Sequence, residues 1–473
     1  MQYSIVSYRI AKDNVDFRYE AEFFLPKYIE HENVLAKRRT IKLCDCAVFN
    51  NGRAFDSNEF SPDGDVYVSK IGDVTQKRDY RSWEKVSRRH FDKLNAKYLK
   101  HNDILMTLTG DPPDVGKTQL IFNPPERNLS WNQRVALIRL KKQKYIVSPE
   151  CLFITLSTKY CREHVERWAK GIRQRNVGNP AVLNMSIPIF TLQFQNHSAE
   201  LVKDSFNLLE RSYNFFFQAE QILLSELGLT NWKPKHQLSF VRNYSDSKKA
   251  DRIDAEYFQP MYDELIEKVK QYRNGHRTIG DCLKIKDRDF TPKDDVQYKY
   301  IELANISANG HINGFIEAMG NELPTRARLK VNSGDVIVSS IEGSLSSIAL
   351  INVELDNALC STGFYVVNSD IINSETLLVL LKSPLGQLQL KKGCSGTILT
   401  AINKDEFKLI LLPSVSQNVR EEIRQKISEM YKAKSVSKKL LDIAKRGVEI
   451  AIEQGEAQAH NWIDQEIRRI PSL

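Results

Sequence analysis

The sequence of 473 residues has no long hydrophobic run and few cysteines. Its longest apolar stretches, such as 377–381 and 409–412, fall far short of the roughly 18 residues that a membrane-spanning helix needs. Residues 1–14 lack the basic flank and apolar core of a secretory signal. The seven cysteines are odd in number and scattered, which is typical of a reducing compartment. We therefore expect a soluble, cytoplasmic protein with no membrane segment.

Motifs for metal binding and catalysis are also missing. Cys44 and Cys46 are too close for a common zinc knuckle, and Cys161 with His164 lacks a second ligand pair. The stretch 110–118 resembles a phosphate loop, but five residues, two of them proline, separate its glycines where the motif has four. No methyltransferase Pro-Pro-aromatic motif, metal-nuclease motif, zinc helix or serine elbow is present. We expect no catalytic site and no metal site in this chain.

What the chain does contain is an internal repeat. Residues 17–28 (FRYEAEFFLPKY) and 251–262 (DRIDAEYFQPMY) are identical at six of twelve positions. Weaker matches follow in the same order: Arg39-Thr40-Ile41 with Arg277-Thr278-Ile279, Asp103-Ile104-Leu105 with Asp335-Val336-Ile337, Lys170-Gly171 with Lys392-Gly393, and Gln195-Asn196 with Gln417-Asn418. Two copies of one module therefore fill the chain.

Each copy is predicted to end in a long helix. In 197–228, Val202, Leu209, Phe216 and Leu223 recur every seven residues, and Gly228 is placed to end the helix. The helix predicted over 417–455 has a comparable stripe, interrupted by Lys434 and Ser437. Because the two stripes occupy matching places, we expect the helices to pack on each other in antiparallel orientation. A helix over 197–228 would span roughly 48 Å, more than one turn of B-DNA.

The rest of each copy has short alternating apolar runs broken by Gly, Pro, Asn and Asp, which is typical of irregular β-rich structure with a few helices. The predicted fold class is therefore α+β, with two repeated globular domains separated by two long antiparallel coiled-coil helices. The predicted boundaries are 1–196 for the first domain, 197–249 for the central spacer helix and linker, 250–416 for the second domain, and 417–473 for the C-terminal spacer helix and tail.

Positive charge is in moderate excess, at a net +9, and part of it is clustered. The richest stretch is 168–179, which contains Lys170, Arg173, Gln174, Arg175 and Asn176. Cations and amides in a glycine-containing loop suit phosphate contacts and the reading of base edges, although a solvated loop is the plain alternative.

The second copy has a matching stretch at 391–397, which we interpret as a loop. It contains Lys391, Lys392 and Thr397 but has small residues in place of Arg173 and Arg175, so we expect the two heads to prefer different sequences. The remaining candidate DNA-binding residues are Lys70, Thr107, Thr109 and Lys117 in the first copy, and Ser339, Ser340 and Ser344 in the second.

This pattern resembles the DNA specificity (S) subunit of type I restriction–modification systems. The resemblance is carried by the R-x-x-A-E-[FY]-F-x-P-x-Y segments at 18–28 and 252–262 and by the helix endings at 219–229 and 444–453. It implies two target-recognition domains, each reading one half of a bipartite site in double-stranded DNA, held apart by the paired helices.

The resemblance also implies partners that carry the chemistry. DNA adenine methyltransferase subunits would bring S-adenosylmethionine, and a separate motor-nuclease subunit would cleave DNA in systems that restrict. This chain would be a non-catalytic recognition subunit without a cofactor of its own. Similar subunits also serve defence systems that only methylate DNA.

Two other functions fit the residues alone. One is binding of structured RNA, and the other is a scaffold whose two heads bind proteins. Competition between duplex DNA and RNA separates the first from DNA recognition. A steep loss of affinity with added salt argues against the second, because phosphate contacts release counterions.

Overall fold

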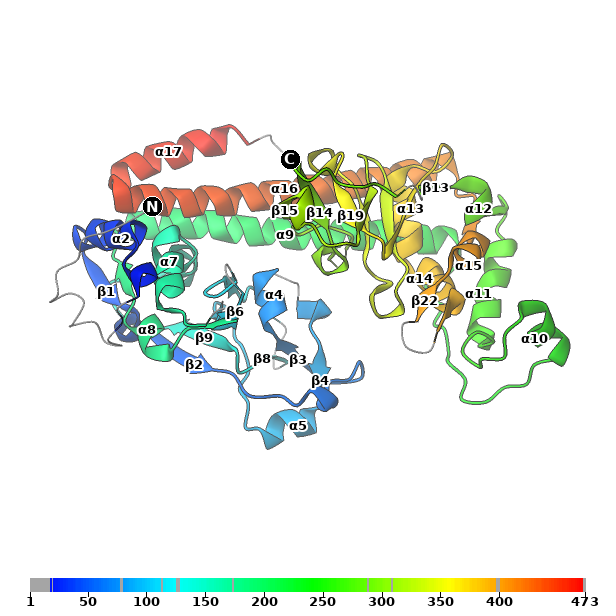
Figure 1. Cartoon of the computed structure of the whole chain (residues 1–473), viewed down its shortest axis with the longest axis horizontal. Coiled ribbons are helices and arrows are strands. Elements are labelled where there is room, and N and C mark those ends of the chain that lie inside the picture. The colour runs from blue at the N-terminus through cyan, green and yellow to red at the C-terminus, as the bar shows by residue number, and fades with distance from the viewer. Residues whose placement is uncertain are drawn as a thin grey trace. The chain divides into compact units, whose positions relative to one another are not determined.

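The computed structural model describes residues 18, 20–76, 80–111, 114–124, 128–171, 174–286, 289–307, 309–396 and 400–470. The chain forms two compact units, each with its own core (Figure 1). Unit 1 comprises Met1–Glu210 and Ala433–Leu473, and unit 2 comprises Arg211–Lys432. Each unit thus combines one globular region with parts of both long helices. The domain boundaries drawn from the sequence remain predictions.

The globular part of unit 1 is built on a four-stranded antiparallel sheet in the order β2-β9-β5-β7. A second, three-stranded sheet has the order β4-β3-β8, with β3 antiparallel to β4 and parallel to β8. Its strands interleave along the chain with those of the four-stranded sheet. The strands are β1 (Thr40–Lys42), β2 (Ala47–Asn51), β3 (Val66–Ser69), β4 (Lys85–Val86), β5 (Ile104–Thr107), β6 (Thr109–Gly110), β7 (Thr118–Leu120), β8 (Leu129–Trp131), β9 (Val135–Leu140), β10 (Arg175–Asn176) and β11 (Ser186–Pro188).

The central strands of this sheet are buried on both faces. Ile104 and Met106 of β5 join one apolar cluster, whereas Leu105 between them joins another, as the two-residue period of a strand requires. Helices α6 and α7 pack on the first of these faces. The helices are α2 (Pro26–Ala36), α3 (Leu43–Cys46), α4 (Ile71–Thr75), α5 (Arg88–Lys93), α6 (Pro149–Leu156), α7 (Lys159–Trp168) and α8 (Asn179–Leu183), with 3-10 turns η1 (Ala21–Phe24), η2 (Ser57–Glu59) and η3 (Tyr80–Ser82).

Unit 2 repeats this framework. Its sheets have the orders β13-β20-β17-β18 and β15-β14-β19-β16. The strands are β12 (His276–Thr278), β13 (Lys284–Lys286), β14 (Gln297–Ile301), β15 (Ile316–Met319), β16 (Ala327–Lys330), β17 (Val336–Ser339), β18 (Ile348–Leu350), β19 (Leu359–Ser361), β20 (Phe364–Asn368), β21 (Cys394–Ser395), β22 (Ala401–Ile402) and β23 (Leu411–Pro413). The helices are α10 (Tyr244–Ala250), α11 (Pro260–Lys270), α12 (Ile279–Cys282), α13 (Ser374–Lys382), α14 (Pro384–Gly393) and α15 (Lys404–Leu409), with 3-10 turns η4 (Leu303–Asn305), η5 (Gly320–Glu322), η6 (Glu342–Ser344) and η7 (Val353–Leu355).

The matched aspartates of the repeat have the same role in both units. Asp103 precedes β5 and accepts the Lys100 N–H at 2.7 Å, and Asp335 precedes β17 and accepts the Asn332 N–H at 2.8 Å. Each is almost fully buried. Each also pairs with a cation of the same sheet: Asp103 with both Nε and Nη2 of Arg139, each at 2.6 Å, and Asp335 with Lys286 Nζ at 2.7 Å. The predicted repeat is therefore confirmed at the level of side-chain contacts.

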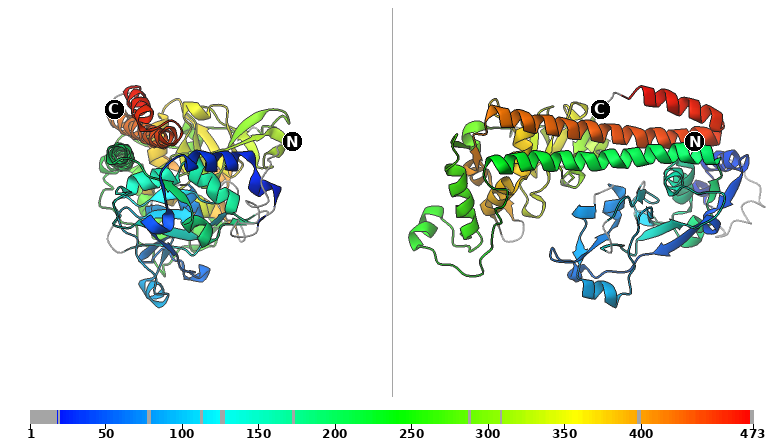
Figure 2. Two further views of the ribbon diagram at one scale, coloured as in Figure 1. Left: turned by 90° about the vertical axis from the view of Figure 1, so that its left-hand side faces the viewer. Right: turned by 180° about the vertical axis from the view of Figure 1, so that it is seen from behind.

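Two long helices complete the framework: α9 (Leu192–Glu226) and α16 (Gln417–Glu453), which lie side by side in Figures 1 and 2. In unit 1 the first part of α9 packs on the last part of α16, and in unit 2 the rest of α9 packs on the beginning of α16. The predicted antiparallel pairing is confirmed. Gly228 follows α9 at φ 64°, in the left-handed region that favours glycine, and ends that helix as predicted.

The most buried seam of α9 is not the predicted one. Small residues spaced by seven form it, namely Ser198, Ser205, Ser212 and Ala219, each at most 1 % exposed. Of the predicted stripe, Val202 and Leu223 are buried, whereas Leu209 and Phe216 are only partly so. Ser437 is not an interruption in α16 either, because Ser205 Oγ donates to its carbonyl oxygen at 2.8 Å. Small side chains let the two backbones approach closely at this point.

The last helix, α17 (Glu456–Arg468), folds back onto unit 1 after Gly455. Ala459 and Ile463 enter the core of that unit. A Cβ atom on Gly447 would lie 2.5 Å from Ile463 Cδ1, so glycine is needed on α16 for this close approach.

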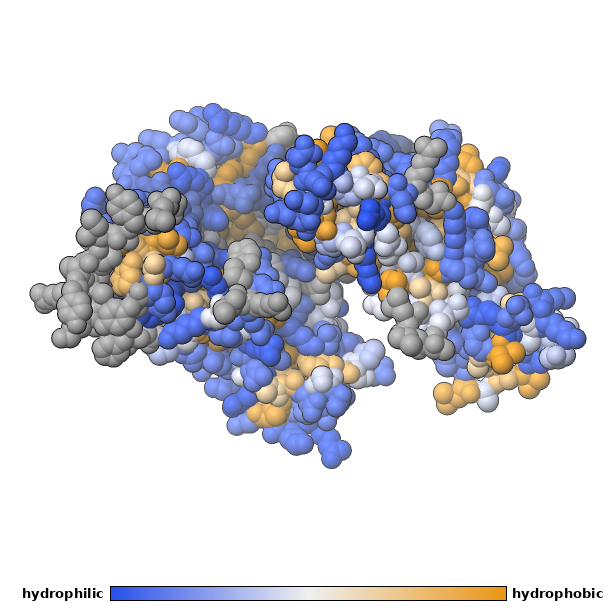
Figure 3. Space-filling model, viewed as in Figure 1, coloured by the Kyte–Doolittle hydropathy of each residue, from blue (hydrophilic) through white to orange (hydrophobic). Residues whose placement is uncertain are grey.

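Exposed apolar side chains gather in the segment before and within α10, where Leu238, Val241 and Tyr244 are each at least 74 % exposed. Figure 3 shows apolar residues beside α10 on an otherwise largely hydrophilic face. Within the described part of the chain, every helix is either too short or too polar to cross a lipid bilayer.

Candidate nucleic-acid interface

A short ribbon of two strands brings several predicted residues of unit 1 together. β6 and β10 pair in antiparallel orientation, with Arg175 opposite Gly110 and Asn176 opposite Thr109. Thr109 is 7 % exposed, and its Oγ1 donates to Asn176 Oδ1 at 2.6 Å. This bond fixes the orientation of the Asn176 amide and leaves its NH₂ group as a donor on an exposed residue.

Two of the candidate residues, Lys170 and Gln174, lie just before β10. Lys170 and Asn176 exchange two backbone hydrogen bonds, at 2.9 and 2.8 Å, which hold these two residues opposite each other. Gly171 has φ 122°, and a Cβ atom there would lie 2.2 Å from the carbonyl oxygen of Gln174. Lys170 and Gln174 are exposed, and Arg175 is half-buried. Arg173 lies outside the described residues.

Thr107 and Lys117 lie at the paired strands β5 and β7 that adjoin this ribbon, Thr107 at the end of β5 and Lys117 just before β7. The fully buried Thr107 Oγ1 donates to the Asp114 carbonyl at 2.6 Å and accepts the Lys117 N–H at 3.0 Å. Lys117 Nζ lies 2.6 Å from Asp114 Oδ1. Thr107 therefore fixes the backbone at Asp114 and Lys117, just before β7, while the Lys117 side chain keeps its charged end at the surface.

Lys70 belongs to a different part of unit 1. It precedes α4, where its Nζ lies 2.6 Å from Glu84 Oε2 and 3.7 Å from the centroid of the Phe60 ring. The ion pair and the cation–π contact fix this side chain on the three-stranded sheet rather than at the ribbon.

In unit 2 the three predicted serines lie close together at the end of β17: Ser339 is its last residue, Ser340 follows it, and Ser344 ends η6. Ser339 is fully buried and its Oγ lies 3.0 Å from Ser344 Oγ. Ser340 Oγ donates to the Gly363 carbonyl at 3.0 Å. The next residue, Ile341, bridges Ala401, so this turn meets the β21–β22 hairpin just as β6 meets β10. The serines therefore shape the turn that supports the hairpin.

Lys391 and Lys392 do not lie in a loop, so that assignment is wrong. They occupy the last turn of α14, where Lys391 Nζ lies 3.2 Å from Glu256 Oε1 and Lys392 Nζ 3.8 Å from Asp263 Oδ1. Burial lowers the pKa of Lys392. Their partners belong to the repeated segment and to α11, so both lysines hold that segment against α14. Thr397 lies outside the described residues.

The backbone shows which residues of the two hairpins correspond. Val177 N–H donates to the Leu108 carbonyl in unit 1, and Ile402 N–H donates to the Ser340 carbonyl in unit 2. Gly396 at φ 129° then matches Gly171 at φ 122°. The counterpart of Gly171 is therefore Gly396, not Gly393 as the sequence match suggests.

This register identifies two residues that the sequence reading missed. Thr400 matches Arg175, and Ala401 matches Asn176. The positive charge and the amide of the unit 1 ribbon are thus replaced in unit 2 by a hydroxyl and a methyl group. The stretch 391–397 contains two glycines, Gly393 and Gly396. Matching Gly396 instead of Gly393 to Gly171 would have identified Thr400 and Ala401 from the sequence.

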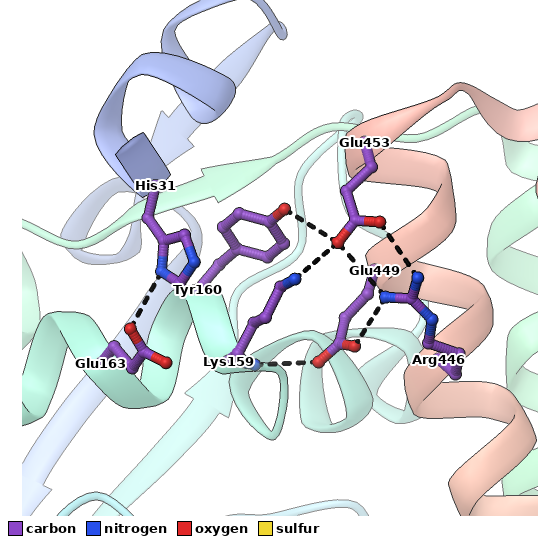
Figure 4. A network of polar contacts seen from close by, with 7 residues as sticks. All are labelled: His31, Lys159, Tyr160, Glu163, Arg446, Glu449 and Glu453. Atoms are coloured by element: carbon purple, nitrogen blue, oxygen red, sulfur yellow. Dashed lines mark hydrogen bonds and ion pairs between the residues drawn. The ribbon is translucent and has the colours of Figure 1, made fainter. Parts of the chain in front are cut away.

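A polar network holds the globular part of unit 1 on α16 (Figure 4). Glu453 Oε1 accepts from Lys159 Nζ at 2.7 Å and from Tyr160 OH at 3.1 Å, and Arg446 reaches both Glu449 and Glu453 at 3.2 Å. Glu449 also accepts the Lys159 N–H at 3.0 Å, which caps the start of α7. α7 ends at Trp168, and Lys170, two residues later, bridges Asn176 of β10. The network therefore positions the chain that leads into the ribbon.

Residues 38–215, which contain the ribbon and its supporting helices, match the sequence profile of the type I restriction modification DNA specificity domain. These residues therefore resemble a type I DNA specificity domain. A segment of this chain also resembles part of the type I restriction enzyme MjaVIII specificity subunit of Methanocaldococcus jannaschii, with 30 % identity over 175 residues. The aligned segment is 36 % of this chain and 40 % of that protein, so it spans about two fifths of its relative.

Two solved structures are similar to this chain over most of its length. The type I S subunit from M. genitalium has 12 % identity and a TM-score of 0.37, covering 92 % of this chain and 96 % of that one. The HsdS subunit from Thermoanaerobacter tengcongensis has 14 % identity and a TM-score of 0.29, covering 88 % and 97 %. The similarity of residues 38–215 to a type I DNA specificity domain therefore rests on the sequence match.

Proposed function

We propose that this chain is the sequence-recognition subunit of a type I or related DNA-modification complex. The observation that carries the proposal is the specificity domain at 38–215, together with the second copy of the same framework in unit 2. Two copies of a recognition framework on one chain suit a bipartite site in double-stranded DNA, with one half read by each unit.

In unit 1 the β6–β10 ribbon has the groups that such a role needs. Lys170 supplies a charge suited to phosphate, while Arg175 and Asn176 supply the guanidinium and amide that pair with guanine and adenine edges in the major groove. Thr109 holds the Asn176 amide in place. A pre-oriented amide loses less conformational entropy on binding than a free one.

In unit 2 the corresponding groups are Thr400 and Ala401. A hydroxyl and a methyl group suit contacts with the thymine methyl and less directional hydrogen bonding. The two halves of the site are therefore expected to differ in sequence.

The chemistry of the complex belongs to partners in this proposal. DNA adenine methyltransferase subunits would supply S-adenosylmethionine and the methyl transfer, and a motor-nuclease subunit would act where the system restricts. This chain would contribute recognition and no catalysis. Action on cellular or incoming DNA places the complex in the cytoplasm.

Selection from a randomised duplex library tests the proposal. The full chain, assembled with its methyltransferase partner, is expected to enrich a split motif with a fixed gap. Its affinity should fall steeply with salt, by a log–log slope close to the number of phosphate contacts. Enrichment of structured RNA in a parallel selection, or a salt-independent affinity for duplex DNA, would contradict it.

A further inference from the structure

Unit 2 contains a cavity of about 370 Å³ where α16 begins beside α12 and α13 (Figure 1). Two guanidinium groups line it, from Arg277 on β12 and Arg420 in the first turn of α16. Ser414 and Ser416 add hydroxyl-bearing residues to the lining, and Ile371 adds an apolar one. Among the described residues that line the cavity there is no carboxylate.

The charges of this cavity are not neutralised within the described part of the chain. Arg277 is exposed, and among the described residues it forms no ion pair with an acidic side chain. Arg420 donates through Nη1 to the Ile371 carbonyl, but its Nε is buried without a hydrogen-bond partner among the described residues. Burial raises the pKa of the lining Cys282 thiol to about 11, so this group supplies no negative charge near neutral pH. A buried donor without an acceptor marks a site that is incomplete as it stands.

In unit 1 the equivalent corner is the place where the β1–β11 strand pair leads into α9, and it is occupied. Thr40 of β1 pairs with Pro188 of β11, and its counterpart Thr278 of β12 pairs with Leu411 of β23. Pro188 therefore matches Leu411. Three residues further on, Thr191, which directly precedes α9, matches Ser414. A carboxylate is bound there: Glu456 of α17 accepts the Thr191 N–H at 3.1 Å and also accepts the Thr191 hydroxyl.

The rest of the unit 1 corner is closed. Arg39, the counterpart of Arg277, lies against the Tyr145 ring with its Cζ 4.8 Å from the centroid. Gln195 donates to the carbonyls of Tyr145 and Phe190 and accepts the Val147 N–H. The cavity beside Gln195 has a volume of about 0 Å³, so it has no room for a ligand. One corner of the repeat thus binds an anionic group from the chain itself, whereas the other is open and cationic.

We propose that the unit 2 cavity binds a small anionic molecule through a carboxylate or phosphate group held between Arg277 and Arg420. Charge-assisted hydrogen bonds from guanidinium groups are the strong contacts for such anions. The first N–H groups of α16 add donors at the same place. The volume is at the lower end of the ~300–1,000 Å³ typical of ligand pockets, so the ligand is a small organic acid or phosphate ester with a short apolar part. This proposal does not depend on the DNA-recognition role.

Isothermal titration calorimetry on the full chain tests it, at a fixed ionic strength of about 0.15 M so that general screening is constant. Inorganic phosphate and glutarate serve as the two anionic probes, and neutral glutaramide serves as the control ligand. We expect one anion to bind with a stoichiometry of one and glutaramide not to bind. The preference between phosphate and glutarate assigns the ligand to phosphate esters or to carboxylic acids.

Variants locate the binding. Arg277→Gln on the exposed edge of β12 should weaken binding by about tenfold or more, and Arg277→Lys by less, because loss of a charge-assisted bond is worth about that factor. Arg39→Gln is the matched control in unit 1 and should leave the affinity unchanged. The proposal is overturned if neither anion binds at millimolar concentration, if glutaramide binds as tightly, or if Arg39→Gln weakens binding as much as Arg277→Gln.

Discussion

Replacing Glu453 by glutamine removes the central charge of the network that holds α7 against α16 in unit 1. Glu453 is in contact with Lys159, Tyr160 and Arg446. The Lys159 and Arg446 side chains are 39 % and 43 % exposed, so water can solvate both after the substitution. Glutamine also keeps an acceptor for Tyr160. We therefore expect Glu453→Gln to cost about 1–2 kcal/mol rather than the ~3–5 kcal/mol of a broken, fully buried pair.

Hydrogen–deuterium exchange of the α7 amides measures this cost locally. About 1–2 kcal/mol corresponds to a roughly 5- to 30-fold increase in the population of the opened state, and hence in the exchange rate. Glu466→Gln on α17 is the control, because Glu466 pairs with the 72 % exposed Arg469 directly after that helix. Such a surface change should cost less than about 0.5 kcal/mol.

The effect of Glu453→Gln should depend on pH. Burial raises the pKa of Glu453, but hydrogen bonds from Lys159 and Arg446 outweigh it and lower the pKa below the ordinary 4.5. A carboxyl group with a lowered folded-state pKa stabilises the fold above its unfolded value and loses this contribution as pH falls through the folded value. The difference between the wild type and the variant should therefore be full at pH 7 and shrink below about pH 4.5. Equal exchange in Glu453→Gln and Glu466→Gln at pH 7, or a difference that persists unchanged at low pH, would refute this reasoning.

Three other variants give separate tests. Arg175→Ala should relax the preference for one base in the first half-site alone, by about 1–3 kcal/mol, when binding is measured on single-base variants of the selected duplex; an effect spread over both half-sites would assign Arg175 to phosphate. Asp103→Ala should destabilise the central sheet of unit 1 by about 2–4 kcal/mol, because it removes a bidentate pair and a capped N–H; exchange of the β5 amides should rise while that of β17 in unit 2 stays unchanged. Gly447→Ala should displace α17 at a cost of about 1–3 kcal/mol, because its Cβ would collide with Ile463; limited proteolysis should then cleave within 456–468 faster, and the double variant with Ile463→Ala should recover part of the protection.

The coarse fold could be predicted because the repeat and the helix periodicity are both encoded locally. Asp103 and Asp335, matched by sequence alone, each accept a backbone N–H from the residue three positions earlier. The seam of α9 was missed because a hydropathy stripe favours large apolar residues. Where two helices approach closely, small residues such as Ser205 and Ala219 are buried instead, and Ser437 finds its partner only across the pair.

The candidate site was harder to predict. Burial of Thr107 and Ser339 depends on strands that are distant in the sequence, so their structural roles were invisible in the chain alone. The lysines at 391–392 were assigned to a loop because Gly393 looked like the turn glycine. Only the positive φ of Gly396 shows where that hairpin turns. Arg175 and Asn176 could be selected as candidates because charge and amides are concentrated there in a single stretch, and their contact with DNA stays a prediction.

In the role proposed above, this chain selects the DNA sequence at which partner subunits methylate adenine. The most direct test is to express the chain with its chromosomal neighbours in a host that lacks DNA methylation, and to sequence the modified bases. We expect methylated adenines in a split motif with a fixed gap and two unlike halves. A stable complex that produces no new modified base would contradict it.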